Sequence, residues 1–182
     1  EKDVENNLIK QNCEIYMIGD KKIPDEQTFL SLIASKIAEG LVIGWFQGKM
    51  EWGPRALGNR SILCDPRRTD MKDILNLKIK RRESFRPFAP SILKERVNEW
   101  FEEESEVPYM MQVYKIKAKK RSLIPAVTHV DGTGRLQTVD IKMNKKYYKL
   151  IKAFYDQTKI PILLNTSFNE NEPIVHNPSE AI

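Results

Sequence analysis

The chain has 182 residues, of which 41% are apolar and 30% are charged, and its formal net charge is +5. This length favours a single domain with a continuous core. No apolar run reaches about 18 residues and the N-terminus lacks a signal-peptide layout, so we expect a cytoplasmic protein with no membrane partner. Cys13 and Cys64 lack the spacing of a disulfide framework or a zinc site, so we expect reduced thiols.

The first predicted element is an amphipathic helix that begins near Asp25 or Thr28 and ends at Gly40. Its apolar residues recur at the spacing of one helix face. They are Phe29, Leu30, Ile33, Ala34, Ile37 and Ala38. The segment 41–46 is short, apolar and β-branched, which predicts a buried strand.

Strands and helices are predicted along the rest of the chain. The strands are 61–64, 89–93, 110–118, 126–130, 135–139 and 160–164, and the helices are 69–77, 94–101 and 144–158. Gly132 and Gly134 can adopt positive φ, so we expect residues 131–134 to join the strands 126–130 and 135–139 in a hairpin. The pattern predicts one α/β domain with a mixed sheet and flanking helices.

We expect the single domain to consist of an N-terminal segment and a core. Residues 1–40 form a lead-in with the first long helix, and residues 41–182 form the core. Near the C-terminus, Asn177 and Pro178 have the sequence of a helix start, with Asn177 as the N-cap and Pro178 at the first position. Because few residues follow, we expect the chain to be a piece of a longer protein with a truncated C-terminus.

Seven of the ten arginines lie between residues 55 and 86. Arginine presents a rigid fork to phosphate oxygens, and glycine lets backbone N–H groups approach a ligand closely. The candidate phosphate ligands in the loop 53–61 are Arg55, Asn59, Arg60 and Ser61. The alternative is a surface loop whose arginines pair with Glu51 and Asp65.

A second basic segment, 80–91, carries four cations in its first seven residues and is stiffened by two prolines. If its backbone is extended, Lys80 and Arg82 share a face and both point at one triphosphate. We expect Lys80, Arg82 and Arg86 to act on the phosphate ligand, and Glu83 to orient an arginine. The alternative is a basic RNA-binding strip with stacking aromatic residues.

Two further segments gather small polar side chains. The segment 128–138 supplies the candidates His129, Asp131, Thr133 and Arg135, although Asp-Gly is also good turn chemistry without a ligand. The segment 165–169 follows a buried strand, and ligands of α/β sheets bind outside such strand ends. Its candidates are Asn165, Ser167 and Asn169.

Several common site types are not expected. The chain lacks the Walker GxxxxGK[ST] motif and the GxGxxG fingerprint, so neither a P-loop nor a classical dinucleotide site is predicted. There is no HExxH motif, and the two histidines, His129 and His176, lie 47 positions apart. We therefore expect no metal ion held by protein side chains of this chain.

Four blocks in this order resemble the C-terminal domain of the O-carbamoyltransferases of nodulation-factor and antibiotic biosynthesis. They are 44–63 with GPRALGNRS, 85–91 with FRPFAPS, 127–133 with VTHVDGT, and 164–169 with LNTSFN. The resemblance implies a YrdC-like α/β fold with a twisted mixed sheet. It also implies a partner domain, which is an N-terminal domain of the actin-like ATPase superfold that holds a metal ion and the acceptor alcohol.

The resemblance further implies an activity and its substrates. Such domains form carbamoyl adenylate from carbamoyl phosphate and ATP with Mg²⁺, and the partner domain transfers the carbamoyl group to a hydroxyl of a sugar, an antibiotic or a similar acceptor. Mg²⁺ is expected to be bound through ATP. The residues that match the family motifs are Arg55, Arg60, Lys80, Arg82, Arg86, His129, Asp131, Arg135, Asn165, Ser167 and Asn169.

Two departures from the family pattern and two alternative functions remain. The loop after Asn169 is shorter than in many members, and Gly134 stands where alanine is common. The same basic face also suits an RNA-binding module, whose binding would fall steeply with salt, but the Gly- and Pro-framed loops favour a pocket and no nucleic-acid partner is expected. The third possibility is a non-catalytic docking domain, which ATP would not stabilise.

Overall fold

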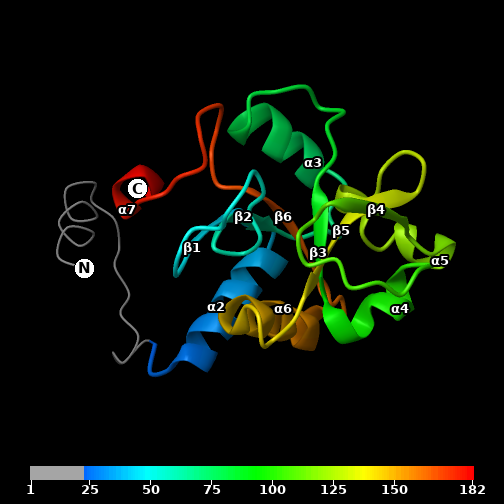
Figure 1. Ribbon diagram of the computed structural model, residues 1–182, viewed down its shortest axis with the longest axis horizontal. Helices are drawn as coiled ribbons and strands as arrows, with labels where there is room; N and C mark the ends of the chain where they lie inside the picture. The colour runs from blue at the N-terminus through cyan, green and yellow to red at the C-terminus, as the bar shows by residue number, and fades with distance from the viewer. Residues whose placement is uncertain (1–22) are drawn as a thin grey trace.

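The computed structural model describes residues 23–182, so the lead-in 1–22 and Cys13 lie outside the described residues. The described residues form one six-stranded sheet in the order β1-β2-β6-β3-β5-β4 (Figure 1). The strands are β1 Ile43–Phe46, β2 Arg60–Cys64, β3 Ala89–Leu93, β4 Gln112–Lys115, β5 Thr133–Val139 and β6 Ile162–Ser167. Strands β3 and β5 are parallel and the other neighbours are antiparallel, which confirms the predicted mixed sheet.

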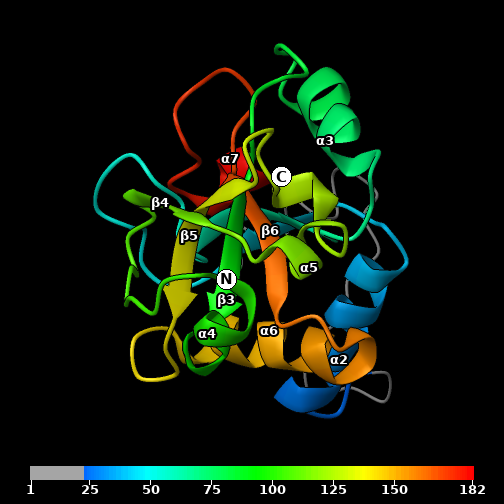
Figure 2. The same cartoon turned by 90° about the vertical axis from the view of Figure 1, so that its right-hand side faces the viewer.

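Two long helices, α2 Glu26–Ala38 and α6 Lys145–Thr158, pack against each other beside the sheet (Figures 1 and 2). Each begins at a side chain that caps it, and this cap was predicted for α2 only. The Asp25 carboxylate accepts a hydrogen bond from the backbone N–H of Thr28 at 2.7 Å, and the Asn144 side chain accepts one from that of Tyr147 at 3.2 Å. The apolar faces of the two helices close the core against the strands.

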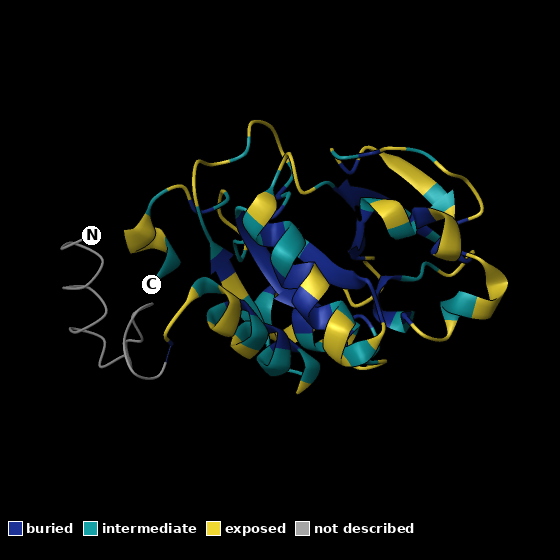
Figure 3. Ribbon diagram, turned by 90° about the horizontal axis from the view of Figure 1, so that it is seen from below, coloured by how far each residue is buried: buried dark blue, intermediate teal, exposed yellow. Residues whose placement is uncertain are grey.

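Figure 3 shows where the core lies: the four central strands are largely buried, the edge strand β4 is mostly exposed, and the helices are buried only on their inner faces. Strands β2 and β3 are buried along their whole length, as expected for strands covered on both faces. Two large aromatic residues of the core, Trp100 and Tyr147, are 2% and 0% exposed. Because these strands are well packed, they hold the loops at their ends in fixed positions.

The remaining helices are short. They are α3 Met71–Asp73, the π-helix Ile74–Ile79, the 3₁₀ turn Lys94–Arg96, α4 Val97–Trp100, α5 Ala118–Arg121, the 3₁₀ turn Pro125–Val127 and α7 Pro178–Ala181. The helices predicted over 69–77 and 94–101 are present, but each contains a turn that is not α-helical. Asn177 caps α7, as predicted. Across residues 23–182, no helix combines the length and apolar character that crossing a bilayer requires.

The predicted hairpin of 126–130 with 135–139 is wrong. Residues Pro125–Val127 form a 3₁₀ turn, and β5 instead pairs antiparallel with β4 and parallel with β3. Pro125 begins the 3₁₀ turn, which favours helical backbone there, and the N–H of Ala126 donates to the carbonyl of Pro66 at 3.1 Å rather than to a strand. Gly132 does adopt a positive φ of 80°, in a tight turn that leads into β5.

Candidate functional site

Three arginines from distant segments line one cavity of about 100 Å³ at the end of the sheet where β3 and β5 begin and β6 ends. Arg55 lies on the loop between β1 and β2, Arg82 follows the π-helix, and Arg135 lies on β5. The rest of the lining consists of Pro54, Ala56, Pro87, Phe88, Ala89, Met110, Asn165, Thr166 and Ser167. We call this cavity the arginine pocket. It contains five of the residues predicted from the sequence: Arg55, Arg82, Arg135, Asn165 and Ser167.

No carboxylate of the described residues forms an ion pair with the arginines of the pocket. Arg55 and Arg135 make no side-chain hydrogen bond or ion pair with any residue of the described range 23–182, and no carboxylate is part of the lining. Burial and the charge of Arg55 lower the pKa of Arg135, and burial with the charges of Arg86 and Arg135 lowers that of Arg82. Arginine nevertheless stays protonated in proteins, so the arginine pocket has the electrostatics of an anion site.

Arg82 is held in place by Asn76 of the π-helix. The Asn76 side chain accepts from Nε of Arg82 at 2.8 Å and donates to the carbonyls of Ser84 and Arg86 at 3.1 and 3.0 Å. The guanidinium also lies 5.1 Å from the centre of the Phe88 ring. Asn76 is fully buried and was not predicted as a site residue, although a polar side chain within the apolar run 74–79 is a usable signal.

A buried polar network forms the floor of the arginine pocket. Gln137 accepts from Oγ of Ser91 at 2.5 Å and from Nδ2 of Asn165 at 2.9 Å, and its own Nε2 donates to the carbonyl of Leu57 at 2.8 Å. Nδ2 of Asn165 also donates to the carbonyl of Ala56 at 3.1 Å. The network therefore ties the loop that carries Arg55 to strands β3, β5 and β6.

Glu51 fixes the same loop from its other side. One carboxylate oxygen accepts from the backbone N–H groups of Leu57 at 2.8 Å and of Asn59 at 2.6 Å. The predicted alternative, in which the arginines of this loop pair with Glu51 and Asp65, is wrong, because neither Arg55 nor Arg60 contacts these carboxylates. The loop is ordered by carboxylate-to-backbone bonds, and the guanidinium group of Arg55 has no partner within residues 23–182.

Arg60 is used inside the fold. Its side chain donates to the carbonyls of Gln47 at 2.7 Å and of Gly48 at 3.1 Å, and it lies 3.5 Å from the centre of the Phe46 ring. Two other candidates of this loop also have internal partners. Oγ of Ser61 accepts from the N–H of Gly58 at 3.0 Å, and Asn59 donates to the carbonyl of Lys49 at 2.8 Å. None of the three lines the arginine pocket.

Lys80 is 2% exposed, and its side chain reaches the end of β6 and the loop that follows it. Its Nζ donates to the carbonyls of Ser167 at 2.5 Å and Asn169 at 2.7 Å, and to Oδ1 of Asn169 at 2.8 Å. The predicted extended segment is wrong, because Lys80 ends the π-helix with φ −85° and Arg81 has φ +45°. Burial, with the charge of Arg82, lowers the pKa of Lys80 to about 8. Lys80 and Asn169 thus shape the loop beside the arginine pocket without lining it.

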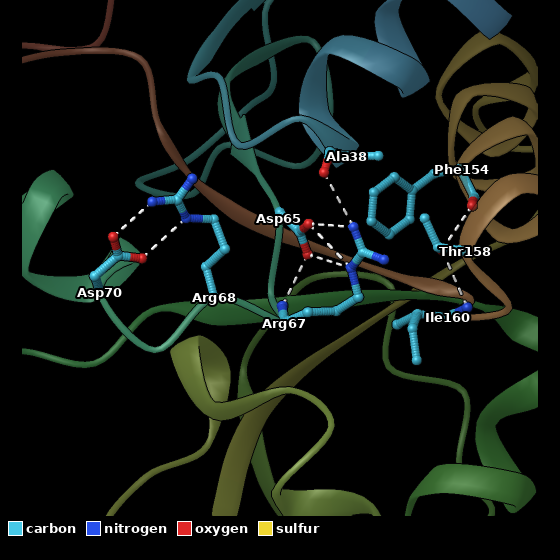
Figure 4. Close-up of polar contacts among 8 residues, drawn as sticks. All are labelled: Ala38, Asp65, Arg67, Arg68, Asp70, Phe154, Thr158 and Ile160. Atoms are coloured by element: carbon cyan, nitrogen blue, oxygen red, sulfur yellow. Dashed lines mark hydrogen bonds and ion pairs between the residues drawn. The ribbon is translucent and has the colours of Figure 1, made fainter.

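Arg86 is exposed and forms an ion pair with Glu83, with Nε 2.9 Å from Oε2. This confirms the prediction that Glu83 orients an arginine. Arg86 does not line the arginine pocket, but its charge acts on Arg82. Arg67 and Arg68 likewise have carboxylate partners: Arg67 with Asp65 and Arg68 with Asp70, both at 2.6 Å (Figure 4).

A second hollow, of about 430 Å³, adjoins the arginine pocket at Pro87. It is lined by Lys72, Phe85, Pro87, His129, Val130 and Asp131. Oδ1 of Asp131 accepts from Oγ1 of Thr133 at 2.7 Å, and Oγ1 of Thr133 lies 3.0 Å from Nδ1 of His129. This series of contacts, from Asp131 through Thr133 to His129, fixes the imidazole. Its buried Nε2 has no partner within the described residues. Lys72 was not predicted, because nothing local marks it, and Phe85 was considered only as a stacking residue of the RNA-binding alternative.

Among residues 23–182, no group of three or more His, Cys, Asp or Glu side chains could hold a metal ion. The arginine pocket and the adjoining hollow are lined by cations, neutral groups and one carboxylate, that of Asp131. Together they bring seven predicted residues to one end of the sheet. The other predicted residues are Lys80, Arg86, Asn59, Arg60, Ser61, Thr133 and Asn169, and each has a partner within the protein.

Comparison with known proteins gives one family and several curated relatives. Residues 34–182 match the family described as "Carbamoyltransferase C-terminus". The chain is 54% identical over 156 residues to nodulation protein NolNO of Sinorhizobium fredii, covering 84% of this chain and 23% of that protein. It is 51% identical over 168 residues to nodulation protein NolO of Bradyrhizobium diazoefficiens, covering 90% of this chain and 31% of that protein.

A relative with a named activity is also found. The chain is 40% identical over 151 residues to the 3'-hydroxymethylcephem-O-carbamoyltransferase of Amycolatopsis lactamdurans, covering 82% of this chain and 28% of that protein. The chain thus spans about a quarter to a third of the length of these three relatives. The matched region includes the arginine pocket and the adjoining hollow.

Proposed function

The chain belongs to the carbamoyltransferase C-terminal domain family, and we propose that it binds carbamoyl phosphate and ATP and forms carbamoyl adenylate. The observation that carries this proposal is the arginine pocket, in which three guanidinium groups face one cavity without a carboxylate. Guanidinium groups bind phosphate oxygens through paired, charge-assisted hydrogen bonds. The cavity is smaller than the roughly 300–1,000 Å³ of pockets for drug-sized ligands, which favours a small phosphate compound over an RNA strand.

The proposed chemistry has two balanced steps. A water oxygen attacks the carbonyl carbon of carbamoyl phosphate and the C–O bond to the phosphate breaks. The two water protons go to the leaving phosphate and to solvent, and the products are carbamate and inorganic phosphate. A carbamate oxygen then attacks the α-phosphorus of ATP, and the new bond to phosphorus forms as the bond to pyrophosphate breaks. Both steps concentrate negative charge, and fixed cations in a site shielded from bulk solvent stabilise such transition states.

The adjoining hollow is the proposed place of the nucleotide. Lys72 supplies a cation, and the exposed side chains of Phe85 and Val130 offer apolar surface for a base. Its shared wall at Pro87 would place ATP next to a ligand in the arginine pocket. Mg²⁺ would enter as part of the ATP complex, held mainly by the phosphates.

Transfer to an acceptor is assigned to the rest of a longer protein. The relatives are three to four times the length of the matched region, and the name of the cephem relative states carbamoyl transfer to a hydroxymethyl compound. We therefore propose a partner domain that uses carbamoyl adenylate and supplies the acceptor hydroxyl. The acceptor would then be selected outside the residues of this chain.

The test is release of pyrophosphate by the full chain with ATP and Mg²⁺, with and without carbamoyl phosphate. We expect release that depends on carbamoyl phosphate and that falls about 100-fold in Arg135→Met, the typical loss for one well-placed transition-state donor. Arg135 has no partner in the described residues, so its loss should not disturb the fold.

The matched control is Arg68→Met. Arg68 belongs to the same arginine-rich stretch but pairs with Asp70 at the surface, so this variant should keep wild-type activity. Absence of carbamoyl-phosphate-dependent release, together with no thermal stabilisation by ATP, would contradict the proposed function. Equal activity of Arg135→Met and Arg68→Met would remove the arginine pocket from the reaction.

A further inference from the structure

Arg82 is bound to one residue, Asn76, at two points. The backbone N–H of Arg82 donates to the carbonyl of Asn76 at 2.9 Å, and Nε of Arg82 donates to Oδ1 of the same residue at 2.8 Å. The two outer nitrogens of the guanidinium have no hydrogen-bond partner within residues 23–182. These contacts leave free the edge that carries the two outer nitrogens, and such an edge can bind two phosphate oxygens at once.

The π-helix explains why the carbonyl of Asn76 is free to bind Arg82. In an α-helix this carbonyl would accept from the N–H of Lys80, four residues further on. In the π-helix the N–H of Lys80 instead donates to the carbonyl of Leu75 at 2.7 Å, five residues back. Arg81, which follows, has a φ of +45°, a strained conformation that persists only where the surrounding structure fixes it. Single π-turns and strained residues occur frequently at functional sites.

The amide of Asn76 also fixes the segment that follows Arg82. Its Nδ2 donates to the carbonyls of Ser84 and Arg86 at 3.1 and 3.0 Å, and Asn76 is 0% exposed. A turned amide would set its oxygen against these two carbonyls and its NH₂ against the N–H of Nε, so one orientation alone satisfies every group. The two residues after Arg86 line the arginine pocket. One buried side chain thus sets both Arg82 and the wall beside it.

The amide holds Arg82 without neutralising its charge. Arg67, Arg68 and Arg86 are each held by a carboxylate, which cancels their charge within their own segment. An aspartate in place of Asn76 would offer the same acceptor to Nε, but its charge would pair with the guanidinium and its second oxygen would face two carbonyls. A neutral side chain with one acceptor and one donor group is therefore what this position requires if Arg82 is to bind an anion.

We propose that Asn76 is a positioning residue of the arginine pocket, which acts on ligand binding through Arg82 and does not touch the ligand. This inference rests on the proposed function, in which Arg82 binds a phosphate group. It assigns to Asn76 two effects on Arg82, a fixed orientation of the guanidinium and a charge left for the ligand. Loss of Asn76 therefore weakens phosphate binding only while Arg82 is present.

The test is a double-mutant cycle on the affinity of the full chain for inorganic phosphate, measured by isothermal titration calorimetry. We expect Asn76→Ala to weaken binding about 10-fold and Arg82→Met to weaken it at least as much, since one charge-assisted contact is worth about that factor. In the double variant the affinity should stay within about 2-fold of that of Arg82→Met. Two effects that multiply, or wild-type affinity in Asn76→Ala, would show a purely structural residue and overturn the proposal.

Two further variants complete the test. Asn76→Asp keeps the acceptor for Nε but pairs its charge with Arg82, so phosphate should bind about as weakly as in Arg82→Met. Wild-type affinity in Asn76→Asp would overturn the proposal, and this variant decides if Asn76→Ala does not fold. Asp25→Ala removes the N-cap of α2, which is not part of the arginine pocket, and should lower the melting temperature without changing phosphate affinity. Weaker binding in Asp25→Ala as well would assign the effect to lost stability and overturn the proposal.

The outcomes separate this inference from the proposed function. If the wild-type chain binds phosphate but the effects of Asn76→Ala and Arg82→Met multiply, the role of Asn76 is overturned while phosphate binding still supports the arginine pocket. If the wild-type chain binds no phosphate and releases no pyrophosphate, the proposed function fails and this inference fails with it.

Discussion

Gly58 and Gly53 offer a matched test of how tightly the loop between β1 and β2, which carries Arg55, is packed. Both glycines have strongly positive φ, 111° and 101°. A Cβ at Gly58 would lie 2.2 Å from Cδ1 and 2.5 Å from Cγ of Tyr147, whereas a Cβ at Gly53 would have no heavy atom within 4 Å. Substitution by alanine therefore imposes similar backbone strain at both positions but a steric clash at only one.

The magnitudes follow from these two contributions. Left-handed backbone costs an L-residue about 1–2 kcal/mol, which is the loss of stability expected for Gly53→Ala. Gly58→Ala adds overpacking, about 1–3 kcal/mol, because Tyr147 is fully buried and its ring cannot move into solvent. A backbone shift at Gly58 would also disturb its carbonyl, which accepts from Nε1 of Trp45 at 2.9 Å.

The assay is urea unfolding of both variants, followed by tryptophan fluorescence and circular dichroism. We expect Gly58→Ala to lose about 2–5 kcal/mol and Gly53→Ala about 1–2 kcal/mol of the free energy of unfolding. Equal losses would refute the reasoning, because they would show that Tyr147 does not hold the loop. The comparison is direct, since the two residues belong to the same loop and differ mainly in the contact with Tyr147.

Two further predictions concern Lys80 and Glu51. The pKa of Lys80 is about 8 in the folded chain and about 10.4 in the unfolded chain, so between these pH values only the unfolded chain binds the proton and stability should rise with pH. The free energy of unfolding of wild type, relative to that of Lys80→Met, should therefore increase by up to about 3 kcal/mol across this range. A difference that does not change with pH would contradict this prediction. Glu51→Ala leaves two loop N–H groups without their acceptor and should cost about 1–3 kcal/mol in urea unfolding and weaken phosphate binding, whereas Glu51→Gln keeps an acceptor; equal stability of the two variants would refute this role.

The elements that the sequence predicts well are those whose signals are local. Helices α2 and α6 each combine a capping side chain with an apolar stripe at helical spacing, and the structure places both within a few residues of the prediction. Strand β3 is found over the predicted residues 89–93. The hairpin of 126–130 failed because a favourable Asp-Gly turn says nothing about which strand lies next to β5; that partner, β4, is selected by contacts across the sheet.

The candidate site was predicted by residue type but not by arrangement. Lys80 and Arg60 carry the same kind of charge as Arg82 and Arg55, yet they donate to backbone carbonyls. The carbonyls bound by Lys80 lie at Ser167 and Asn169, almost ninety residues away in sequence, so no local pattern could reveal them. Asn76 was missed for the converse reason, because a polar residue in a largely apolar segment indicates burial without indicating its partner. Gln137 lies among polar neighbours in β5, where nothing local shows that it binds Asn165.

Some arginines of the segment 55–86 have a carboxylate partner, and those that line the arginine pocket do not. Arg67, Arg68 and Arg86 each pair with an acidic side chain two or three residues away, so their charge is neutralised within their own segment. The arginines of the pocket instead meet other guanidinium groups, and burial with neighbouring like charges lowers the pKa of Arg82 and of Arg135.

The fold sustains this repulsion through neutral contacts. Asn76 and the ring of Phe88 hold Arg82, and the floor of Asn165 and Gln137 holds the loop that carries Arg55. A doubly charged phosphate would relieve the repulsion among all three guanidinium groups at once. Ligand binding should therefore stabilise the folded chain more than a single surface ion pair does, since the ligand's charge removes the repulsion among the guanidinium groups.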